Sequence, residues 1–122
     1  MEYHGIIFEV EQRDKSIFNQ LNVTNKFTIK EGTSYKILVD EKDLEKTINL
    51  LQNNLPKGQY VHLHKSGEYI IIFERMVFRL KVDEKTGDAT GKTTWEDVMD
   101  YSRKTTGTPK EDFFGITSCC QN

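Results

Sequence analysis

The stretch Gln59–Phe73 constrains the fold of this chain most, because it predicts a β-hairpin down to individual residue pairs. Ser66-Gly67 is a two-residue turn signal between runs of β-branched and aromatic residues. A turn there places Lys65 opposite Glu68, a favourable charge pair, and fixes each further pair along the two strands. Because side chains alternate between the faces of a strand, one face is aliphatic and the other is aromatic and histidine-rich. The aliphatic face comprises Val61, Leu63, Ile70 and Ile72, and the other comprises Tyr60, His62, His64, Tyr69, Ile71 and Phe73.

The remaining strand and helix signals predict an α+β fold. The alternation beyond Phe73 continues as far as Asp83, so we expect one long strand with a bulge near Glu74-Arg75. The whole pattern predicts a single mixed or mostly antiparallel sheet of about five strands, packed with two to three helices. Residues 1–109 would form a single domain and 110–122 a C-terminal tail. The predicted strand regions are 3–12, 26–39 and 59–83, and the predicted helices, caps included, are 14–21, 40–56 and 94–107.

Capping residues support the two longer helices. Asp40 stands before the strongest helical pattern, which Pro56 ends. Thr94 and Asp97 have the spacing of a capping box at the start of the last helix. The side chains expected to face inward are Leu44, Ile48, Leu51 and Leu55 in the first of these helices, and Trp95, Val98, Met99 and Tyr101 in the second.

The segment 26–39 predicts a second hairpin. A three-residue loop, Glu31-Gly32-Thr33, would align Phe27 with Ile37 and Ile29 with Tyr35. Its apolar face carries little protective charge. If this hairpin lies at an edge of the sheet, it could therefore pair with a second copy of the chain or with a strand of another protein.

Composition indicates a soluble globular protein. Of the 122 residues, 36% are hydrophobic and 30% are charged, and the net charge is −2. This negative charge disfavours electrostatic, sequence-independent binding to nucleic acid. A local basic patch would still be compatible with the net charge. No apolar run approaches the roughly 18 residues of a membrane span, so we expect no membrane partner. The N-terminal residues do not resemble a signal peptide, and we expect a cytoplasmic location.

The only two cysteines, Cys119 and Cys120, are adjacent and close to the C-terminus. Neighbouring cysteines form a strained disulfide, and two thiols without nearby histidines do not make a zinc site. The pair belongs either to an exposed, inert tail or to a lipidated one, and the sequence favours the inert tail.

The paired histidines are the main candidates for chemistry. His62 and His64 point the same way from one strand, a spacing that can hold zinc or place an acid and a base beside a phosphate. His4 could add a third ligand if the first strand were adjacent. Histidines at the edge of a partly covered sheet face are the simpler interpretation. We therefore predict no metal and no cofactor.

The segment Thr86–Thr93 has the glycines and the Gly-Lys pair of a phosphate-binding loop. That motif needs four residues between its first glycine and the Gly-Lys pair, and here three separate Gly87 from Gly91. The segment is thus predicted to be a flexible turn, while amides at the start of the last helix could still hold an anion.

The sequence is compatible with two functions. The favoured one is a macromolecule-binding or regulatory domain without catalytic activity, such as an inhibitor, an immunity-type protein or a chaperone, with a protein partner or as a homo-oligomer. The alternative is a nucleotide- or RNA-binding protein, a phosphodiesterase or nuclease with His62 and His64 as catalytic candidates. The two differ in whether the histidine face is open or is covered by the last helix. In the alternative function, the ligand-binding residues would be Tyr60, His62, His64, Tyr69, Arg75, Arg79 and Lys81.

Overall fold

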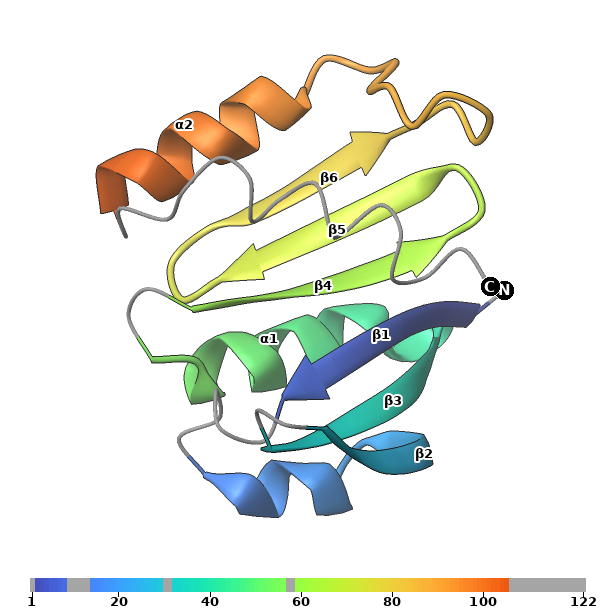
Figure 1. The fold of residues 1–122 in the computed structure, drawn as a ribbon, viewed down its shortest axis with the longest axis vertical. Coiled ribbons are helices and arrows are strands. Elements are labelled where there is room, and N and C mark those ends of the chain that lie inside the picture. The colour runs from blue at the N-terminus through green and yellow to red at the C-terminus, as the bar shows by residue number, and fades with distance from the viewer. Residues whose placement is uncertain (1, 9–13, 30–31, 57–58, 106–122) are drawn as a thin grey trace.

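The chain forms one six-stranded sheet with two α-helices (Figure 1). The computed structural model describes residues 2–8, 14–29, 32–56 and 59–105. The predicted boundary at residue 109, the tail and Cys119 and Cys120 lie outside these residues. The strands are β1 (Glu2–Phe8), β2 (Asn22–Ile29), β3 (Gly32–Asp40), β4 (Tyr60–Lys65), β5 (Glu68–Phe73) and β6 (Val77–Lys81). The helices are α1 (Leu44–Asn54) and α2 (Trp95–Thr105), with short 3-10 turns η2 (Lys15–Asn19) and η3 (Glu41–Asp43).

The strand order is β2-β3-β1-β4-β5-β6, and every neighbouring pair is antiparallel. The predicted α+β class with a single, mixed or mostly antiparallel sheet is therefore confirmed, and the sheet has six strands where about five were expected. The β4–β5 hairpin has the predicted register, from Lys65 opposite Glu68 to Tyr60 opposite Phe73. Gly67 supplies the positive φ, 78°, that this tight turn needs.

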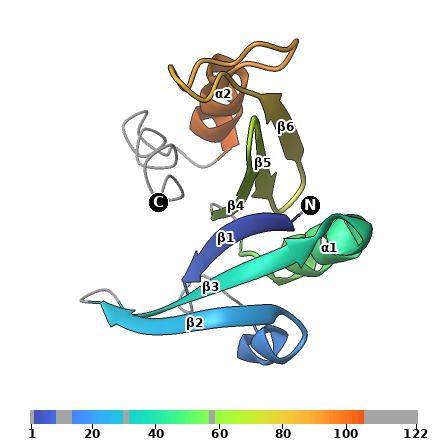
Figure 2. The same ribbon diagram turned by 90° about the vertical axis from the view of Figure 1, so that its right-hand side faces the viewer.

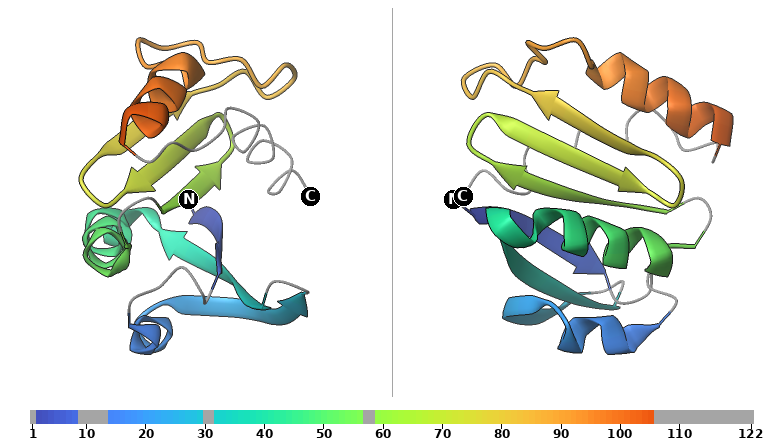
Figure 3. Two further views of the ribbon diagram at one scale, coloured as in Figure 1. Left: turned by 60° about the vertical axis from the view of Figure 1, so that its left-hand side comes forward. Right: turned by 180° about the vertical axis from the view of Figure 1, so that it is seen from behind.

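The sheet consists of two halves, β2-β3-β1 and β4-β5-β6, that meet between β1 and β4. Within the described residues this seam has two residue pairs, His4 with His64 and Gly5 with Leu63. The neighbouring ladders of β1 with β3 and of β4 with β5 are longer, at seven and six pairs. Helix α1 contacts β3 and β5, the strands on either side of β1 and β4, and in the rear view of Figure 3 it lies in front of the seam.

The sheet face that α1 and η2 cover, here called the α1 face, contains the larger core. Leu51 of α1 and Ile17 of η2 pack there against buried sheet residues. Asp14 and Asp40 accept hydrogen bonds from the amides of Ser16 and Lys42. Each caps a 3-10 turn, η2 or η3, at a place where a helix was predicted to begin, and α1 itself follows Asp43, which makes no side-chain cap bond. The sheet residues of this core are Tyr3, Ile7, Ile37, Val39, Val61, Leu63, Ile70 and Ile72.

The opposite face, here called the α2 face, has a second core over β4, β5 and β6. Figure 2 shows α1 and α2 on different sides of the sheet. The predicted capping box begins α2: the Thr94 hydroxyl accepts from the Asp97 amide, and the Asp97 carboxylate accepts from the Thr94 amide. Val98 and Met99 are buried, and Trp95 and Tyr101 pack beside them, as predicted. Their buried partners are Tyr69, Ile71, Phe73 and Leu80 of the sheet, and Val82 just after β6.

The long strand predicted through residue 83 is wrong, because the chain reverses at Glu74-Arg75. The Phe73 amide donates to the Met76 carbonyl at 2.8 Å, and β6 then runs antiparallel along β5. The site of the predicted bulge is therefore a tight turn. The turn inverts the alternation, so that Leu80 belongs to the α2 face and not to the aliphatic face of the preceding strand.

The predicted register of the 26–39 hairpin is also wrong. Phe27 lies opposite Ser34, and Val23 lies opposite Ile37 past a bulge at Thr24. The ladder closes with Ile29 opposite Gly32, so the connection is shorter than the three residues expected. As a result Phe27 is on the α2 face, where 40% of its surface is exposed.

Within the described part of the chain, no helix combines the length and the apolar character that crossing a membrane requires.

Candidate functional site

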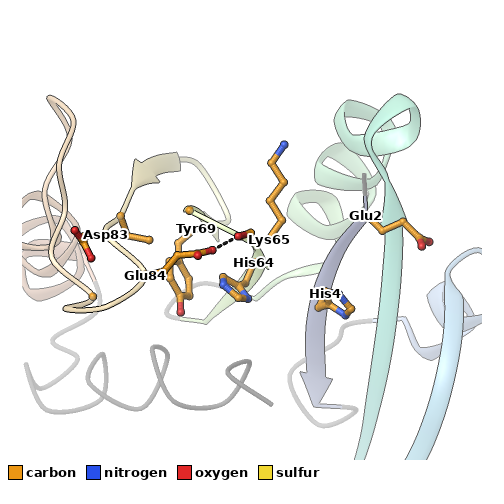
Figure 4. A pocket seen from close by; sticks show the side chains of 11 residues that line it. Glu2, His4, His64, Lys65, Tyr69, Asp83 and Glu84 are labelled. Atoms are coloured by element: carbon orange, nitrogen blue, oxygen red, sulfur yellow. Dashed lines mark hydrogen bonds between the residues drawn. The ribbon is translucent and has the colours of Figure 1, made fainter.

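A pocket of about 520 Å³ lies on the α2 face beside the seam between β1 and β4 (Figure 4). It is enclosed by the ends of β1, β4 and β5, the Ser66-Gly67 turn and the loop that follows β6. Its lining residues are Glu2, His4, His64, Lys65, Ser66, Gly67, Tyr69, Val82, Asp83, Glu84 and Gly87.

A row of three side chains crosses the sheet at this pocket. His4 is opposite His64 across the seam, and His64 is opposite Tyr69 across the β4–β5 hairpin. The rings of His64 and Tyr69 are stacked, with centroids 4.5 Å apart and an interplanar angle of 29°. Strand β1 is thus adjacent to β4, the strand that contains His62 and His64. This was the condition for His4 to lie beside them.

Burial decreases along this row. Tyr69 is 4% exposed, and Trp95 of α2 packs edge-on against its ring with centroids 5.4 Å apart. His64 is half-buried and His4 is exposed. Tyr69 is therefore the buried end of the row and His4 the solvent-exposed end.

Lys65 is among the lining residues, but its ammonium lies away from the pocket. Its Nζ is 3.5 Å from Glu41 and 3.6 Å from Glu68, and it lies 4.8 Å from the centroid of the Tyr3 ring. The contact with Tyr3 is the main cause that raises the pKa of Lys65. In Figure 4 the Lys65 ammonium points away from His64 and Glu84.

The wall formed by residues 82–87 is a hydrogen-bonded turn. The Asp83 carboxylate accepts from the amides of Lys85 and Thr86, and the Gly87 carbonyl accepts from the Trp95 indole. The Glu84 carboxylate accepts from the Ser66 hydroxyl and so joins this wall to the β4–β5 turn.

The resemblance to a phosphate-binding loop does not extend to the structure. Residues 86 and 87 belong to the turn that Asp83 organises, and Ala89 forms a β-bridge with Val82. At the start of α2, the amide of Thr94 donates to a carboxylate of the chain itself, that of Asp97.

The structure brings together two of the predicted ligand-binding residues, His64 and Tyr69, at the pocket. The other two residues predicted on this face do not line it. Tyr60 packs against Phe73, with ring centroids 5.7 Å apart, and His62 is buried with 8% of its surface exposed. The catalytic candidates therefore differ in solvent exposure, because His62 is buried and His64 is half-buried.

The three predicted cations lie away from the pocket. Arg75 is in the β5–β6 turn, beside Glu74. Arg79 pairs with Glu45 of α1, on the α1 face, and Lys81 follows two positions later along β6. The turn at Glu74-Arg75 is the reason, because it inverts the alternation that placed Arg79 and Lys81 beside the histidines.

Sequence reasoning missed that Glu2, Asp83 and Glu84 are among the residues that line the pocket. No local motif joins these residues, and only the order of the strands brings residue 2 close to residue 84. Among the described residues, no group of three or more His, Cys, Asp or Glu side chains is arranged to hold a metal ion.

Comparison of the chain with protein-family models, with curated proteins and with solved structures gives no match.

Proposed function

We propose that the chain is a protein-binding, regulatory domain without catalytic activity, and that it recognises an extended segment of its partner at strand β2. The observation that carries this proposal is that β2 is an edge strand of eight residues. An edge strand presents backbone amides and carbonyls that a further strand can pair with.

The two edges of the sheet differ. β6 has five residues, two of them the cations Arg79 and Lys81. The segment after it also returns along this edge, since Val82 bridges to Ala89 and the Thr90 amide donates to the Lys81 carbonyl at 2.8 Å. Charge, short length and a covering segment are common protections of an edge strand. No described segment pairs with the outer side of β2.

The side chains of β2 also suit a binding edge. Lys26 is its only charged residue. Phe27, 40% exposed, is one of two large hydrophobic residues that are exposed in the described part of the chain; the other is Met76, 41% exposed. An aromatic side chain beside an unpaired backbone edge would add apolar contact to main-chain hydrogen bonds.

The arrangement of the histidine face supports binding more than catalysis. Helix α2 covers Tyr69, Ile71 and Phe73, so this part of the face is used for core packing. The alternative function needs cations beside the histidines to hold phosphate, and Arg79 is instead paired with Glu45 behind the sheet. Nucleotide and RNA binding thus have less support from the geometry than protein binding.

The test compares substitutions at two equally exposed apolar residues. Phe27→Lys places a charge on β2, and Met76→Lys makes the same change in the β5–β6 turn. Wild type and both variants are used to capture partners from a lysate of the source cells. The captured protein is then purified, and its affinity for each form is measured by calorimetry. Circular dichroism checks that all three forms are folded.

We expect wild type and Met76→Lys to bind the purified partner equally, and Phe27→Lys to bind about tenfold more weakly, the loss of one well-packed contact. Light scattering distinguishes self-association: a wild-type dimer that Phe27→Lys converts to a monomer would identify the partner as a second copy. Equal affinity of the two folded variants for the partner would contradict a role of β2.

A further inference from the structure

We propose that the partner strand at β2 is an acidic segment of another protein, with a carboxylate opposite Lys26 and an apolar side chain opposite Phe27. This inference rests on the proposed function and adds the chemistry of the partner. The charges of β2 and β3, the two faces of β2 and the bulge at Thr24 carry it.

The edge of the sheet formed by β2 and β3 is positively charged. Its charged residues are Lys26, Lys36 and Asp40, and the Asp40 carboxylate, at the end of β3, accepts from the Lys42 amide. The ion pairs among the described residues join other side chains, so neither Lys26 nor Lys36 has an acidic partner there. A strand added at this edge is therefore favoured if it carries acids and disfavoured if it carries further cations.

Lys26 is the cation nearest to an added strand. It is exposed on the α1 face, opposite Tyr35 in the β2–β3 ladder. Its Nζ is 5.7 Å from the centroid of the Tyr35 ring, which is stacked on Phe18 with centroids 3.8 Å apart. A cation–π contact at this distance and exposure is weak, so the ammonium can turn to a carboxylate on an added strand.

Lys36 adds a second positive charge on the α2 face, the face of Phe27. It is half-buried and lies opposite Asn25, which is exposed. A strand added outside β2 would be two strand spacings from β3, roughly 10 Å, which a glutamate and a lysine side chain span together. Because Asn25 is short and uncharged, a glutamate opposite it can pair with Lys36 over it.

The bulge at Thr24 limits the edge that a partner can use. The β2–β3 ladder shifts between Val23 and Asn25, and the Thr24 hydroxyl donates to the Lys36 carbonyl at 3.3 Å. Because a bulge interrupts the regular row of edge groups, we expect the partner to pair with residues 25–29. An added strand that continues the antiparallel pattern then faces residues 27, 26 and 25 with an apolar residue followed by two acids.

This order of side chains distinguishes another protein from a second copy. Strand β2 itself contains no aspartate or glutamate. Pairing of β2 with β2 of a second copy would thus bring two copies of Lys26 and no carboxylate to the new ladder, and like charges across a ladder are destabilising. Charge complementarity therefore favours an acidic strand from a different protein.

Three short, capped peptides of threonine and valine are the probes. The first has phenylalanine followed by two glutamates at its centre, and the others carry two glutamines or two lysines in place of the glutamates. Each is titrated into the isotopically labelled chain, and amide shifts are followed by NMR. The variants are Lys26→Gln and Lys26→Glu, with Lys81→Gln as the matched control, because Lys81 is on β6 at the opposite edge of the sheet. Circular dichroism checks that each form is folded.

We expect the glutamate peptide to shift the amides of residues 25–29 and to bind most tightly. Its Kd should be about two- to fivefold lower than that of the glutamine peptide, the range of an exposed ion pair. Lys26→Gln should reduce this preference, and Lys81→Gln should leave it unchanged. Lys26→Glu should bind the lysine peptide more tightly than wild type does, because the pair is restored with its charges exchanged.

Equal affinity for the three peptides, with shifts within 25–29, would overturn this inference and leave the proposed function standing, since β2 would then bind strands of any charge. Lys26→Gln behaving like Lys81→Gln would overturn it in the same way. No shift within 25–29 with any peptide would also overturn it, while the captured partner and Phe27→Lys test the proposed function separately. A wild-type dimer that Phe27→Lys converts to a monomer would identify a second copy as the partner and overturn the acidic one.

Discussion

At the scale of single residues, Gly5 shows how closely the two halves of the sheet approach each other. A Cβ atom at this position would lie 2.7 Å from Leu63 Cδ2 and 3.0 Å from the His62 carbonyl oxygen. Leu63 is fully buried, so its methyl group has little room to move, and the carbonyl belongs to the β4 backbone. Glycine at position 5 is thus what allows β1 to pair with β4 at the seam.

Gly5→Ala should destabilise the protein by about 1–3 kcal/mol, the usual cost of forcing extra atoms into a packed core. Gly91→Ala is the control, because its Cβ would be 3.8 Å from the nearest atom, the Lys81 Cβ. The control should change the free energy of unfolding by less than about 0.5 kcal/mol. Urea titration measures both, and equal values for the two variants would show that the seam tolerates a side chain.

Tyr3 links the stability of β1 to pH. Its hydroxyl donates to Glu68 at 3.1 Å, and burial raises the pKa of the phenol above its ordinary 10.0. Because the folded state favours the neutral phenol, this contribution is complete below pH 10.0 and is lost as pH rises through the raised pKa. The pKa of Lys65 is raised as well, so its contribution declines in the same direction.

Tyr3→Phe should therefore lower stability by about 0.5–1.5 kcal/mol near neutral pH, through loss of one hydrogen bond. It should also reduce the decline in stability as pH rises from about pH 10 to about pH 12. Urea titrations of wild type and variant over this range measure the difference. Parallel pH profiles would mean that Tyr3 does not contribute to the alkaline decline.

At the scale of elements, the sequence predicted those parts that depend on local signals. The β4–β5 register followed from Gly67 in a two-residue turn, and the start of α2 followed from Thr94 and Asp97. The β5–β6 turn gave no such signal, since Glu74-Arg75-Met76 contains neither glycine nor asparagine, and no described residue other than glycine has a positive φ. The alternation of apolar residues therefore looked continuous.

Helix α1 was also predicted from its own periodicity, and it packs on the sheet through Leu51, which has no exposed surface. Leu51→Ala should cost about 2–5 kcal/mol through lost apolar transfer and cavity formation. Asn53→Ala, at an exposed position of the same helix, should change stability by no more than about 0.5 kcal/mol. In denaturant titrations, a loss at Leu51 no greater than that at Asn53 would show that the helix does not stabilise the sheet.

At the scale of the whole molecule, the strand order determines both the pocket and the proposed binding edge, and the sequence did not reveal it. Placing β1 between β3 and β4 sets His4 opposite His64 and brings Glu2 to the pocket. The same order leaves β2 at an edge and places β3 inside the sheet, although the two strands belong to one hairpin. Such pairings join residues far apart in sequence, which no local pattern encodes.

Hydrogen exchange of the complex tests whether a partner strand pairs with β2. Backbone amides that gain a strand partner exchange more slowly. We expect that binding of the purified partner slows exchange within 22–29 and leaves exchange within 77–81, on the opposite edge, unchanged. Slower exchange along 77–81 or over α2, with 22–29 unaffected, would contradict it.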